Sequence, residues 1–270
     1  MPVNLCIAGA AGRMGQRLIA LGLEDPELKV AYALETSGHA WIGKDVGIVS
    51  GLGRDIGAPV ARSICPNCGV QAIIDFTIHS AATALTEEAA TLGIPIVIGT
   101  TGMTADEKAR IAAAAKKIPI IHAPNFSVGV NVLFKLATLA ARTLGPDYDI
   151  EIVEAHHNQK IDAPSGTAHG LAEAIAKGLD TNLADVAVYG REGNIGKRPK
   201  KEIGIHAVRM ADVVGEHTAY FAIGGERIEL THKASSRDTF ARGALRAAKW
   251  LVQEKRAPGF YTMSQVLGLE

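Results

Sequence analysis

The densest group of chemically capable side chains lies between Glu154 and Ala168. Two adjacent histidines, His156 and His157, are followed three residues later by Lys160. A histidine titrates near neutral pH, and a lysine supplies a cation that can bind an anion or donate a proton. This combination predicts a site that binds a small anionic molecule and transfers protons to or from it.

The same stretch ends in Asp-Ala-Pro-Ser-Gly-Thr, a pattern typical of the start of a helix. Backbone N–H groups in the first turn of a helix lie at its positive end, where a carboxylate or phosphate binds favourably. Ser165, Gly166 and Thr167 are therefore candidate anion-binding residues. Each histidine taken alone is explained as well by a solvated side chain near a helix cap, but the whole cluster favours a functional site.

The segments on either side of the cluster indicate how it is positioned. Residues 149–154 alternate polar and apolar side chains, which is typical of a half-buried strand. Leu171, Ile175 and Leu179 recur at helical spacing. The cluster is thus expected on a loop between a strand end and a helix start, a common location for functional residues.

This stretch resembles the signature of the dihydrodipicolinate reductase family. The family pattern, Glu-x-His-His-x-x-Lys-x-Asp-x-Pro-Ser-Gly-Thr-Ala, is met at every fixed position. The resemblance implies a reduction of 4-hydroxy-tetrahydrodipicolinate to tetrahydrodipicolinate with loss of water, in lysine and diaminopimelate biosynthesis. It further implies that His156 is a proton donor and acceptor and that Lys160 is a proton donor. His157, together with the backbone of Gly166 and Thr167, would bind a substrate carboxylate.

The N-terminus has the features of a dinucleotide-binding segment. An expected strand over residues 3–8 leads into a glycine-rich turn that ends at Gly15, and a helix follows. Such a turn lets the backbone approach a pyrophosphate at the helix N-terminus. The motif is a weak signal by itself, because Ala11 replaces the middle glycine of the common pattern. The candidate cofactor-binding residues are Gly9, Ala10, Ala11, Gly12, Arg13 and Met14.

An acidic residue supports this interpretation. The expected strand over 28–34 is followed by Glu35, twenty residues after Gly15, where a carboxylate binds the ribose hydroxyls of NAD. A carboxylate there also repels the 2′-phosphate of NADP. Some members of the resembled family carry an arginine after this acid and accept both cofactors, whereas here the position is Thr36. We predict a preference for NADH and leave NADPH open, because Arg13 could reach a phosphate.

Strands and helices alternate as far as residue 127. Strands are expected over 70–76, 94–98 and 118–122, and helices over 80–92 and 105–117. This alternation predicts a doubly wound parallel sheet that binds ligands at its C-terminal strand ends. Turn chemistry alone would explain each strand-end segment, but two of them also resemble cofactor-binding and hinge segments of the same reductase family. The additional cofactor-binding candidates are Gly99, Thr100, Thr101, Ala123, Pro124, Asn125 and Phe126.

A second group of strands follows the central cluster. They are expected near 203–210, 213–223 and 226–233. Asp212 and the glycine pair at 224–225 predict tight connections and therefore antiparallel pairing of successive strands. This part of the chain is expected to form an open, largely antiparallel sheet.

The predicted fold class is α/β with two domains. Residues 1–127, completed by a C-terminal helical segment over 238–270, would form a Rossmann-like dinucleotide-binding domain. Residues 128–237 would form an α+β domain for substrate binding and oligomerisation. The resemblance implies that the open sheet of this second domain builds a homotetramer.

Composition narrows the choice of partners and location. The chain has 28 basic and 28 acidic residues, so no global charge favours a nucleic acid or a membrane surface. The basic residues over 197–201 are most simply a solvated loop. The apolar run over 128–141 is too short to span a bilayer, and no secretory signal is apparent. Three cysteines favour the cytoplasm over a disulfide framework, and the lone pair Cys65 and Cys68 predicts no metal site.

Two alternatives to the reductase are left open. One is another two-domain NAD-dependent dehydrogenase, although a semialdehyde dehydrogenase would need a catalytic cysteine and none follows Cys68. The other is a catalytically inactive NAD-binding regulator, which would have little reason to keep the histidine pair together with Lys160. The roles of Lys233 and Arg237 are also left open, since solvation at a helix start explains them as well as ligand contact.

Overall fold

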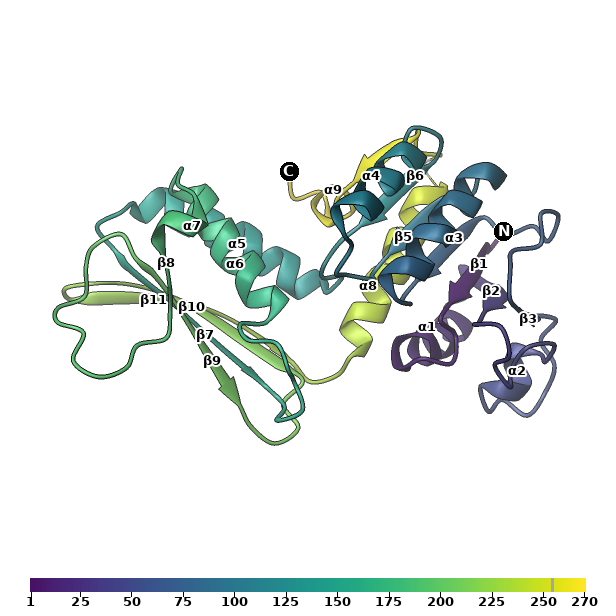
Figure 1. The fold of residues 1–270 in the computed structure, drawn as a ribbon, viewed down its shortest axis with the longest axis horizontal. Helices are drawn as coiled ribbons and strands as arrows, with labels where there is room; N and C mark the ends of the chain where they lie inside the picture. Colours follow the sequence, from purple (N-terminus) through teal and green to yellow (C-terminus); the bar gives the residue numbers. More distant parts are fainter. Residues whose placement is uncertain (254) are drawn as a thin grey trace. The chain divides into compact units, whose positions relative to one another are not determined.

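The computed structural model describes residues 1–253 and 255–270. The chain divides into two compact units, each with its own sheet and its own helices (Figure 1). The first unit comprises residues 1–127 and 238–270, and the second comprises residues 128–237.

The first unit is built on a seven-stranded parallel sheet with the strand order β12-β6-β5-β4-β1-β2-β3. The order reverses between β1 and β4, which creates the crevice where doubly wound sheets bind ligands. The strands are short apolar runs because both faces of the sheet are covered. They are β1 (Val3–Ala8), β2 (Leu28–Leu34), β3 (Val60–Ala61), β4 (Ala72–Asp75), β5 (Ile96–Ile98), β6 (Pro119–His122) and β12 (Gly259–Tyr261).

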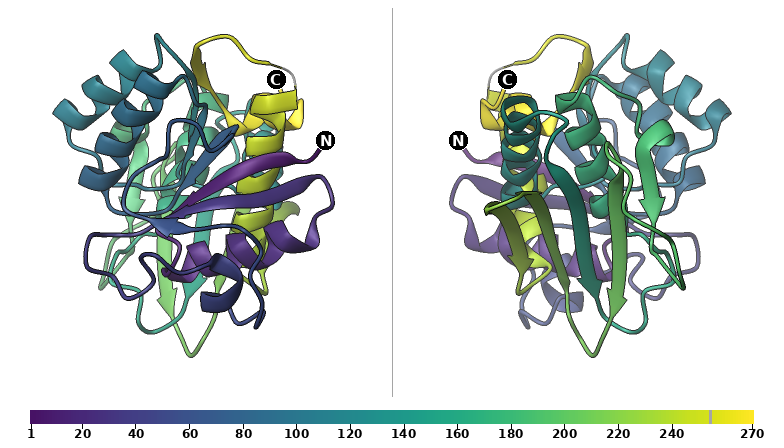
Figure 2. Two further views of the ribbon diagram at one scale, coloured as in Figure 1. Left: turned by 90° about the vertical axis from the view of Figure 1, so that its right-hand side faces the viewer. Right: turned by 90° about the vertical axis from the view of Figure 1, so that its left-hand side faces the viewer.

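Helices cover this sheet on both sides (Figure 2). One core packs α1 (Arg13–Glu24) and α8 (Asp238–Gln253) against one face, and a second core packs α3 (His79–Leu92) and α4 (Ala105–Ala114) against the other. This arrangement is the doubly wound fold that the sequence predicted. The short helices α2 (Val46–Val49) and α9 (Met263–Leu267) and the edge strand β12 were not predicted, because each has too few residues to show a period.

The second unit contains a mixed five-stranded sheet with the order β11-β10-β7-β9-β8. Helices α5 (Val128–Leu144) and α6 (Gly166–Gly178) pack together and form an apolar core with one face of this sheet. The short helix α7 (Leu183–Val186) follows α6. The strands are β7 (Asp149–His156), β8 (Ala187–Tyr189), β9 (Ile203–Arg209), β10 (Gly215–Ile223) and β11 (Glu226–Ala234).

One expected pairing in this sheet is wrong. The segments 203–210 and 213–223 are not an adjacent antiparallel pair, because β10 pairs with β7 and β9 lies on the far side of β7, parallel to it. Because β7 and β9 are parallel, they end at the same edge of the sheet. After a short connection from β9, the strand β10 can therefore start beside either of them. The connection instead crosses the end of β7, where the Met210 N–H donates to the His156 carbonyl over 2.8 Å. This crossing brings the start of β10, at Gly215, beside His156.

The interpretation of residues 197–201 as a solvated loop is wrong for Arg198. Its guanidinium donates to Glu151 over 2.8 Å and to Asp149 over 2.7 Å, both on β7. Arg191 reaches the same Glu151 carboxylate over 2.9 Å. The loop before β9 is therefore held against β7 by ion pairs, and these arginines are not available to an external anion.

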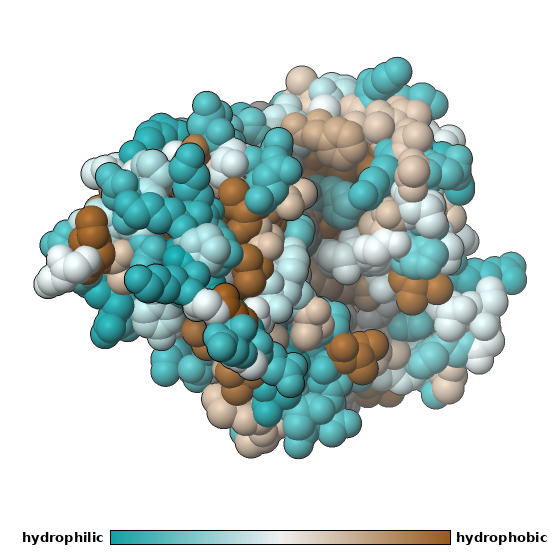
Figure 3. All heavy atoms as spheres, turned by 60° about the vertical axis from the view of Figure 1, so that its left-hand side comes forward, coloured by the Kyte–Doolittle hydropathy of each residue, from teal (hydrophilic) through white to brown (hydrophobic). Residues whose placement is uncertain are grey.

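The surface of the molecule mixes polar and apolar side chains. On the side shown in Figure 3, hydrophobic residues are interspersed with hydrophilic ones. None of the helices in the described ranges is both long and apolar enough to cross a membrane.

Candidate cofactor and substrate sites

Three loops meet at the C-terminal edge of the first unit's parallel sheet. They follow β1, β4 and β5 and line a cavity of about 430 Å³. The structure therefore brings together six of the residues predicted from separate segments, with further residues after β4 that the sequence did not indicate. The lining residues are Gly12, Arg13, Met14, Phe76, Thr77, Ile78, His79, Gly99, Thr100 and Thr101.

The loop after β1 fits a bound pyrophosphate. A Cβ on Gly15 would lie 2.1 Å from the carbonyl oxygen of Gly9, so only glycine allows this close turn. Gly9 itself has a φ of +74°. Helix α1 begins after Gly12, and no side chain caps its N-terminus. The first backbone N–H groups of this helix thus have no side-chain cap, which is the usual arrangement for binding phosphate.

Glu35 lies against this loop. One carboxylate oxygen accepts the Ala11 N–H over 2.7 Å, and the other accepts the Thr36 N–H over 3.1 Å. The carboxylate is therefore held next to the glycine-rich turn.

The end of β4 supplies a polar network that the sequence did not indicate. Asp75 is fully buried and accepts hydrogen bonds from the hydroxyls of Thr100, over 2.6 Å, and Thr77, over 2.7 Å. Burial raises the pKa of Asp75, and the two threonine hydrogen bonds oppose that effect. The network fixes the loops after β4 and β5 to each other. The sequence signal was limited to an acidic residue at the end of an expected apolar strand, because the strand order is not visible in the sequence.

The predicted segment over 123–126 follows β6 and does not line the cavity. Phe126 is buried and packs against Phe76, with ring centroids 6.0 Å apart. Ala123 and Asn125 are also buried, whereas Pro124 is exposed. This segment therefore supports the cavity wall through Phe76.

The predicted substrate site lies in the second unit, at the end of β7. Alternation along the strand places Glu154 and His156 on the same face, toward the N-terminus of α6. Glu154 is fully buried, and one of its oxygens lies 2.6 Å from Nδ1 of His156. Arg209 on β9 donates to both Glu154 oxygens over 2.8 and 3.0 Å. The Ser165 N–H adds a further bond of 3.0 Å.

These contacts fix the charge of Glu154 and the orientation of His156. Burial favours a raised pKa for Glu154, but the hydrogen bonds from His156, Arg209 and the Ser165 backbone outweigh it and lower the pKa to about 2. The carboxylate is therefore ionised at neutral pH. Because Nδ1 of His156 is held by Glu154, Nε2 is the ring nitrogen left for proton exchange with a substrate.

Lys160 lies on the loop between β7 and α6. Its ammonium contacts both oxygens of Asp162 over 2.8 and 2.9 Å. Burial raises the pKa of Asp162, but the hydrogen bond from Lys160 contributes to a net lowering. Arg209 donates to the Asp162 carbonyl over 2.6 Å, so the loop is tied to the same guanidinium that binds Glu154.

The other predicted substrate residues surround the start of α6. Ser165 is buried, and its hydroxyl accepts the Ala168 N–H over 3.1 Å as the helix cap, so this side chain is directed inward. Gly166 is exposed and Thr167 is half-buried in the first turn, where the helix dipole favours an anion. His157 is half-buried and precedes Lys160 in a turn closed by a backbone bond of 3.1 Å.

Two further basic residues had unassigned roles. Lys233 lies on β11 and forms an ion pair with Glu216 over 3.1 Å. Arg237 is exposed just before α8.

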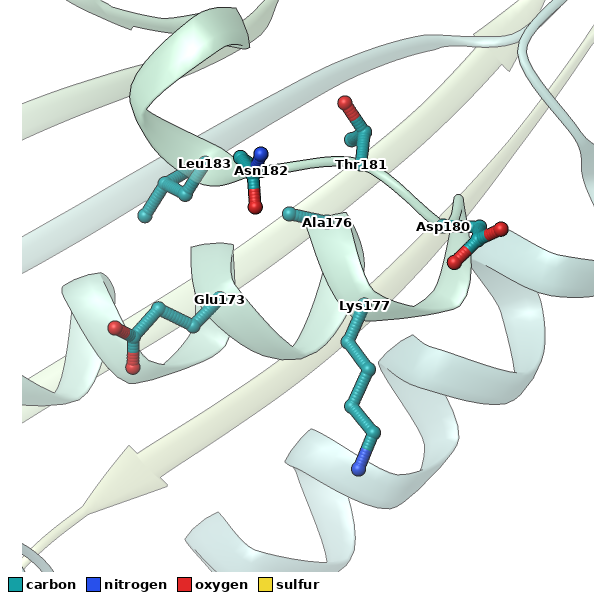
Figure 4. Close-up of a pocket in the computed structure, with 7 residues that line it drawn as sticks. All are labelled: Glu173, Ala176, Lys177, Asp180, Thr181, Asn182 and Leu183. Atoms are coloured by element: carbon teal, nitrogen blue, oxygen red, sulfur yellow. The ribbon is translucent and has the colours of Figure 1, made fainter.

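A different hollow of about 420 Å³ lies at the C-terminal end of α6 (Figure 4). It is lined by Glu173, Ala176, Lys177, Asp180, Thr181, Asn182 and Leu183. None of these is a predicted site residue, and the hollow lies at the opposite end of α6 from Gly166. Among residues 1–253 and 255–270, no group of three or more histidine, cysteine, aspartate or glutamate side chains is arranged to hold a metal ion.

The acidic residues of β7 predict an acid-sensitive second unit. Burial opposes the ionisation of both Glu151 and Glu154, but their hydrogen bonds lower both pKa values from 4.5 to about 2. A lowered folded-state pKa stabilises the fold above the unfolded value, and this contribution is lost as the pH falls from 4.5 toward 2. Urea unfolding should therefore show a lower midpoint at about pH 3 than at neutral pH. An unchanged midpoint would contradict the two lowered pKa values.

Comparisons with known proteins cover both units. Residues 3–126 match the family model described as dihydrodipicolinate reductase, N-terminus, and residues 129–267 match dihydrodipicolinate reductase, C-terminus. Among curated relatives, the 4-hydroxy-tetrahydrodipicolinate reductase of Desulfotalea psychrophila is 52% identical, covering 99% of this chain and 98% of that protein. The reductase of Thiobacillus denitrificans is 49% identical, covering both chains completely.

Solved structures show the same fold. A dipicolinate-bound dihydrodipicolinate reductase from Paenisporosarcina sp. TG-14 gives a TM-score of 0.76 at 23% identity, over 97% of this chain and 98% of that one. An amine dehydrogenase from Mycobacterium smegmatis gives 0.61 at 11% identity, over 97% and 95% of the two chains. The fold is thus shared more widely than the sequence. Because the two family models together span nearly the whole length and the curated relatives are about half identical, the chain belongs to the dihydrodipicolinate reductase family.

Proposed function

We propose that the protein catalyses the reduction of 4-hydroxy-tetrahydrodipicolinate to tetrahydrodipicolinate with loss of water, in the lysine and diaminopimelate pathway of the cytoplasm. The observation that carries this proposal is the ion-paired Glu154, His156 and Arg209 group beside the N-terminus of α6. The direct test of this proposal is whether the protein oxidises a reduced nicotinamide cofactor only when substrate is added.

The second unit's residues suit a dicarboxylate that gains a proton. The first turn of α6, at Gly166 and Thr167, supplies backbone N–H groups and a positive dipole for one carboxylate. His157 lies at the start of the loop between β7 and α6, and by the family resemblance it would bind the same carboxylate. His156 would exchange a proton through Nε2, and Lys160 would donate a proton or hold the second anionic group. Ser165 would contribute through its position as the helix cap, because its hydroxyl points inward.

A nicotinamide dinucleotide would be held by the loops of the first unit and would supply the hydride. The uncapped start of α1 would bind its pyrophosphate, and the segments over 99–101 and 123–126 would support the nicotinamide end. Glu35, held beside the glycine-rich turn, would bind a ribose 2′-hydroxyl, and its negative charge would disfavour a 2′-phosphate. We infer a preference for NADH over NADPH.

The preference can be tested at Glu35. Replacement of Glu35 by Ala should weaken NADH binding about tenfold or more, because hydrogen bonds to a charged group contribute roughly 1.5–3 kcal/mol. NADPH binding should change less, since the same substitution removes repulsion from its phosphate. Titration of the protein with each cofactor, followed by fluorescence, measures the dissociation constants of NADH and NADPH.

Glu24→Ala is the matched control, because Glu24 is exposed at the far end of α1. It should leave both constants unchanged. If Glu35→Ala weakens both cofactors equally, Glu35 acts by holding the Ala11 N–H of the turn and does not select the ribose.

We also infer a homotetramer assembled through the second sheet. Helices α5 and α6 form the core with one face, and side chains of the outer strand β11 are largely exposed. Val208 and Ile228 are exposed apolar residues on this sheet. Sedimentation velocity of the purified protein measures the assembly state, and a monomer at micromolar concentration would contradict the tetramer.

A further inference from the structure

His217 occupies a buried position next to the predicted proton donor. It lies on β10 directly opposite Glu154 of β7 in the strand register, and it is 3% exposed. Its ring meets the ring of His156 edge-on, with centroids 5.1 Å apart and an angle of 74° between planes. Its Nε2 lies 3.0 Å from the hydroxyl of Ser165. His217 thus contacts both the histidine and the helix cap of the site.

The chemistry of His217 differs from that of a proton-transfer group. Burial, followed by the charge of His156, lowers the pKa of His217 to about 3, so its ring is neutral at physiological pH. Within residues 1–253 and 255–270, its Nδ1 is buried without a hydrogen-bond partner. A buried nitrogen without a hydrogen-bond partner carries a free-energy cost. An apolar residue would avoid that cost, so stability alone does not account for a histidine here.

The ring of His156 needs a second contact to hold its direction. The bond from Nδ1 to Glu154 fixes one ring atom, but the ring can still tilt about that bond. The ring of His217 packs against one side of the His156 ring. A Cβ at Gly215 would lie 3.0 Å from Nε2 of His156 and 3.7 Å from Cε1 of His217, so the absence of a side chain there keeps space next to this nitrogen.

We propose that His217 is a positioning residue for His156, which holds the imidazole so that Nε2 faces the space over Gly215. The proposal rests on the proposed role of His156 in proton transfer. His217 does not exchange a proton in the reaction, and its hydrogen bond to Ser165 fixes its own ring against the start of α6.

Two substitutions separate the ring contact from the hydrogen bond. His217→Gln keeps a polar group near the position of Nε2 but removes the aromatic edge. His217→Phe keeps an aromatic edge but removes the bond to Ser165. Because small displacements of a reacting group can cost about 10²-fold in rate, His217→Gln should lower kcat by about 10- to 100-fold, with the KM for NADH unchanged. His217→Phe should retain more of the wild-type kcat than His217→Gln.

The matched control is His206→Gln, since His206 lies on β9 and contacts Glu151 over 2.7 Å, on the opposite face of the sheet from Glu154. It should have the wild-type kcat. Thermal unfolding of every variant shows whether the second unit remains folded. If His217→Gln is as active as His217→Phe or more active, the ring contact is not what matters and the proposal fails.

A double substitution separates positioning from general structural support. If His217 acts through His156, adding His217→Gln to His156→Gln should cause no further loss of kcat. The same fold-loss in both backgrounds would overturn the proposal. If His156→Gln alone has near-wild-type activity, the assignment of His156 fails first, and with it the basis for a positioning residue.

Discussion

Replacing His156 by Gln should lower kcat by about 10²- to 10⁴-fold, the usual contribution of a general acid or base. Glutamine can still accept or donate a hydrogen bond, but it cannot carry a proton between solvent and substrate at neutral pH. Lys160→Ala should cause a loss in the same range, because it removes the second proton donor of the loop. Steady-state rates with saturating cofactor measure both effects.

Two residues elsewhere in the second unit provide matched controls for these variants. Lys177→Ala makes the same change at the opposite end of α6 from the β7–α6 loop, and His206→Gln makes it on the opposite face of the sheet from Glu154. Both should keep wild-type rates. Near-wild-type activity in either His156→Gln or Lys160→Ala would remove that residue from the proton-transfer assignment.

The second large effect is expected at Glu154. Glu154→Gln should lower the free energy of unfolding by about 3 kcal/mol, because removing one partner of a buried ion pair leaves the other charge uncompensated. The uncompensated charge here is Arg209, whose side chain is partly exposed, so the low end of the usual range applies. The same change should lower kcat by about 10²-fold, since it removes the anion that holds Nδ1 of His156.

Glu151→Gln is the control that separates these two effects. Glu151 lies on the same strand, has an equally low pKa of about 2 and also binds arginines, but it lies on the opposite face of the sheet. It should lower stability without a direct effect on His156. If Glu151→Gln reduces kcat as much as Glu154→Gln, the catalytic loss comes from weakening the sheet and not from the bond to His156. Urea unfolding and steady-state kinetics on both variants decide between the two.

The local segments of the site could be predicted because each carries its own signal. The turn that ends at Gly15 requires glycine for its close backbone approach, and Glu35 follows a strand at the expected spacing. Polar and apolar residues alternate up to Glu154, the polar cluster follows, and apolar residues then recur at helical spacing. Such signals depend on neighbours within one element, so they are visible without the fold.

The side chains from neighbouring strands that surround Glu154 and His156 could not be predicted, because they depend on strand order. Arg209 and His217 come from strands on either side of β7, and the expected hairpin between those two strands would have excluded β7 from between them. Asp75 is a different case. Its strand was predicted, but the buried carboxylate binds one hydroxyl from the loop after its own strand and one from the loop after β5, and the pairing of those loops is visible only in the folded sheet.

The most direct test of the central claim is oxidation of NADH by the purified protein, with substrate produced in the cuvette from pyruvate and aspartate semialdehyde by its synthase. NADPH is run in parallel, and omission of the synthase is the control. We expect rapid oxidation only when the synthase is present, with NADH used better than NADPH. No synthase-dependent oxidation with either cofactor, from protein shown to be folded, would contradict the proposed reductase activity.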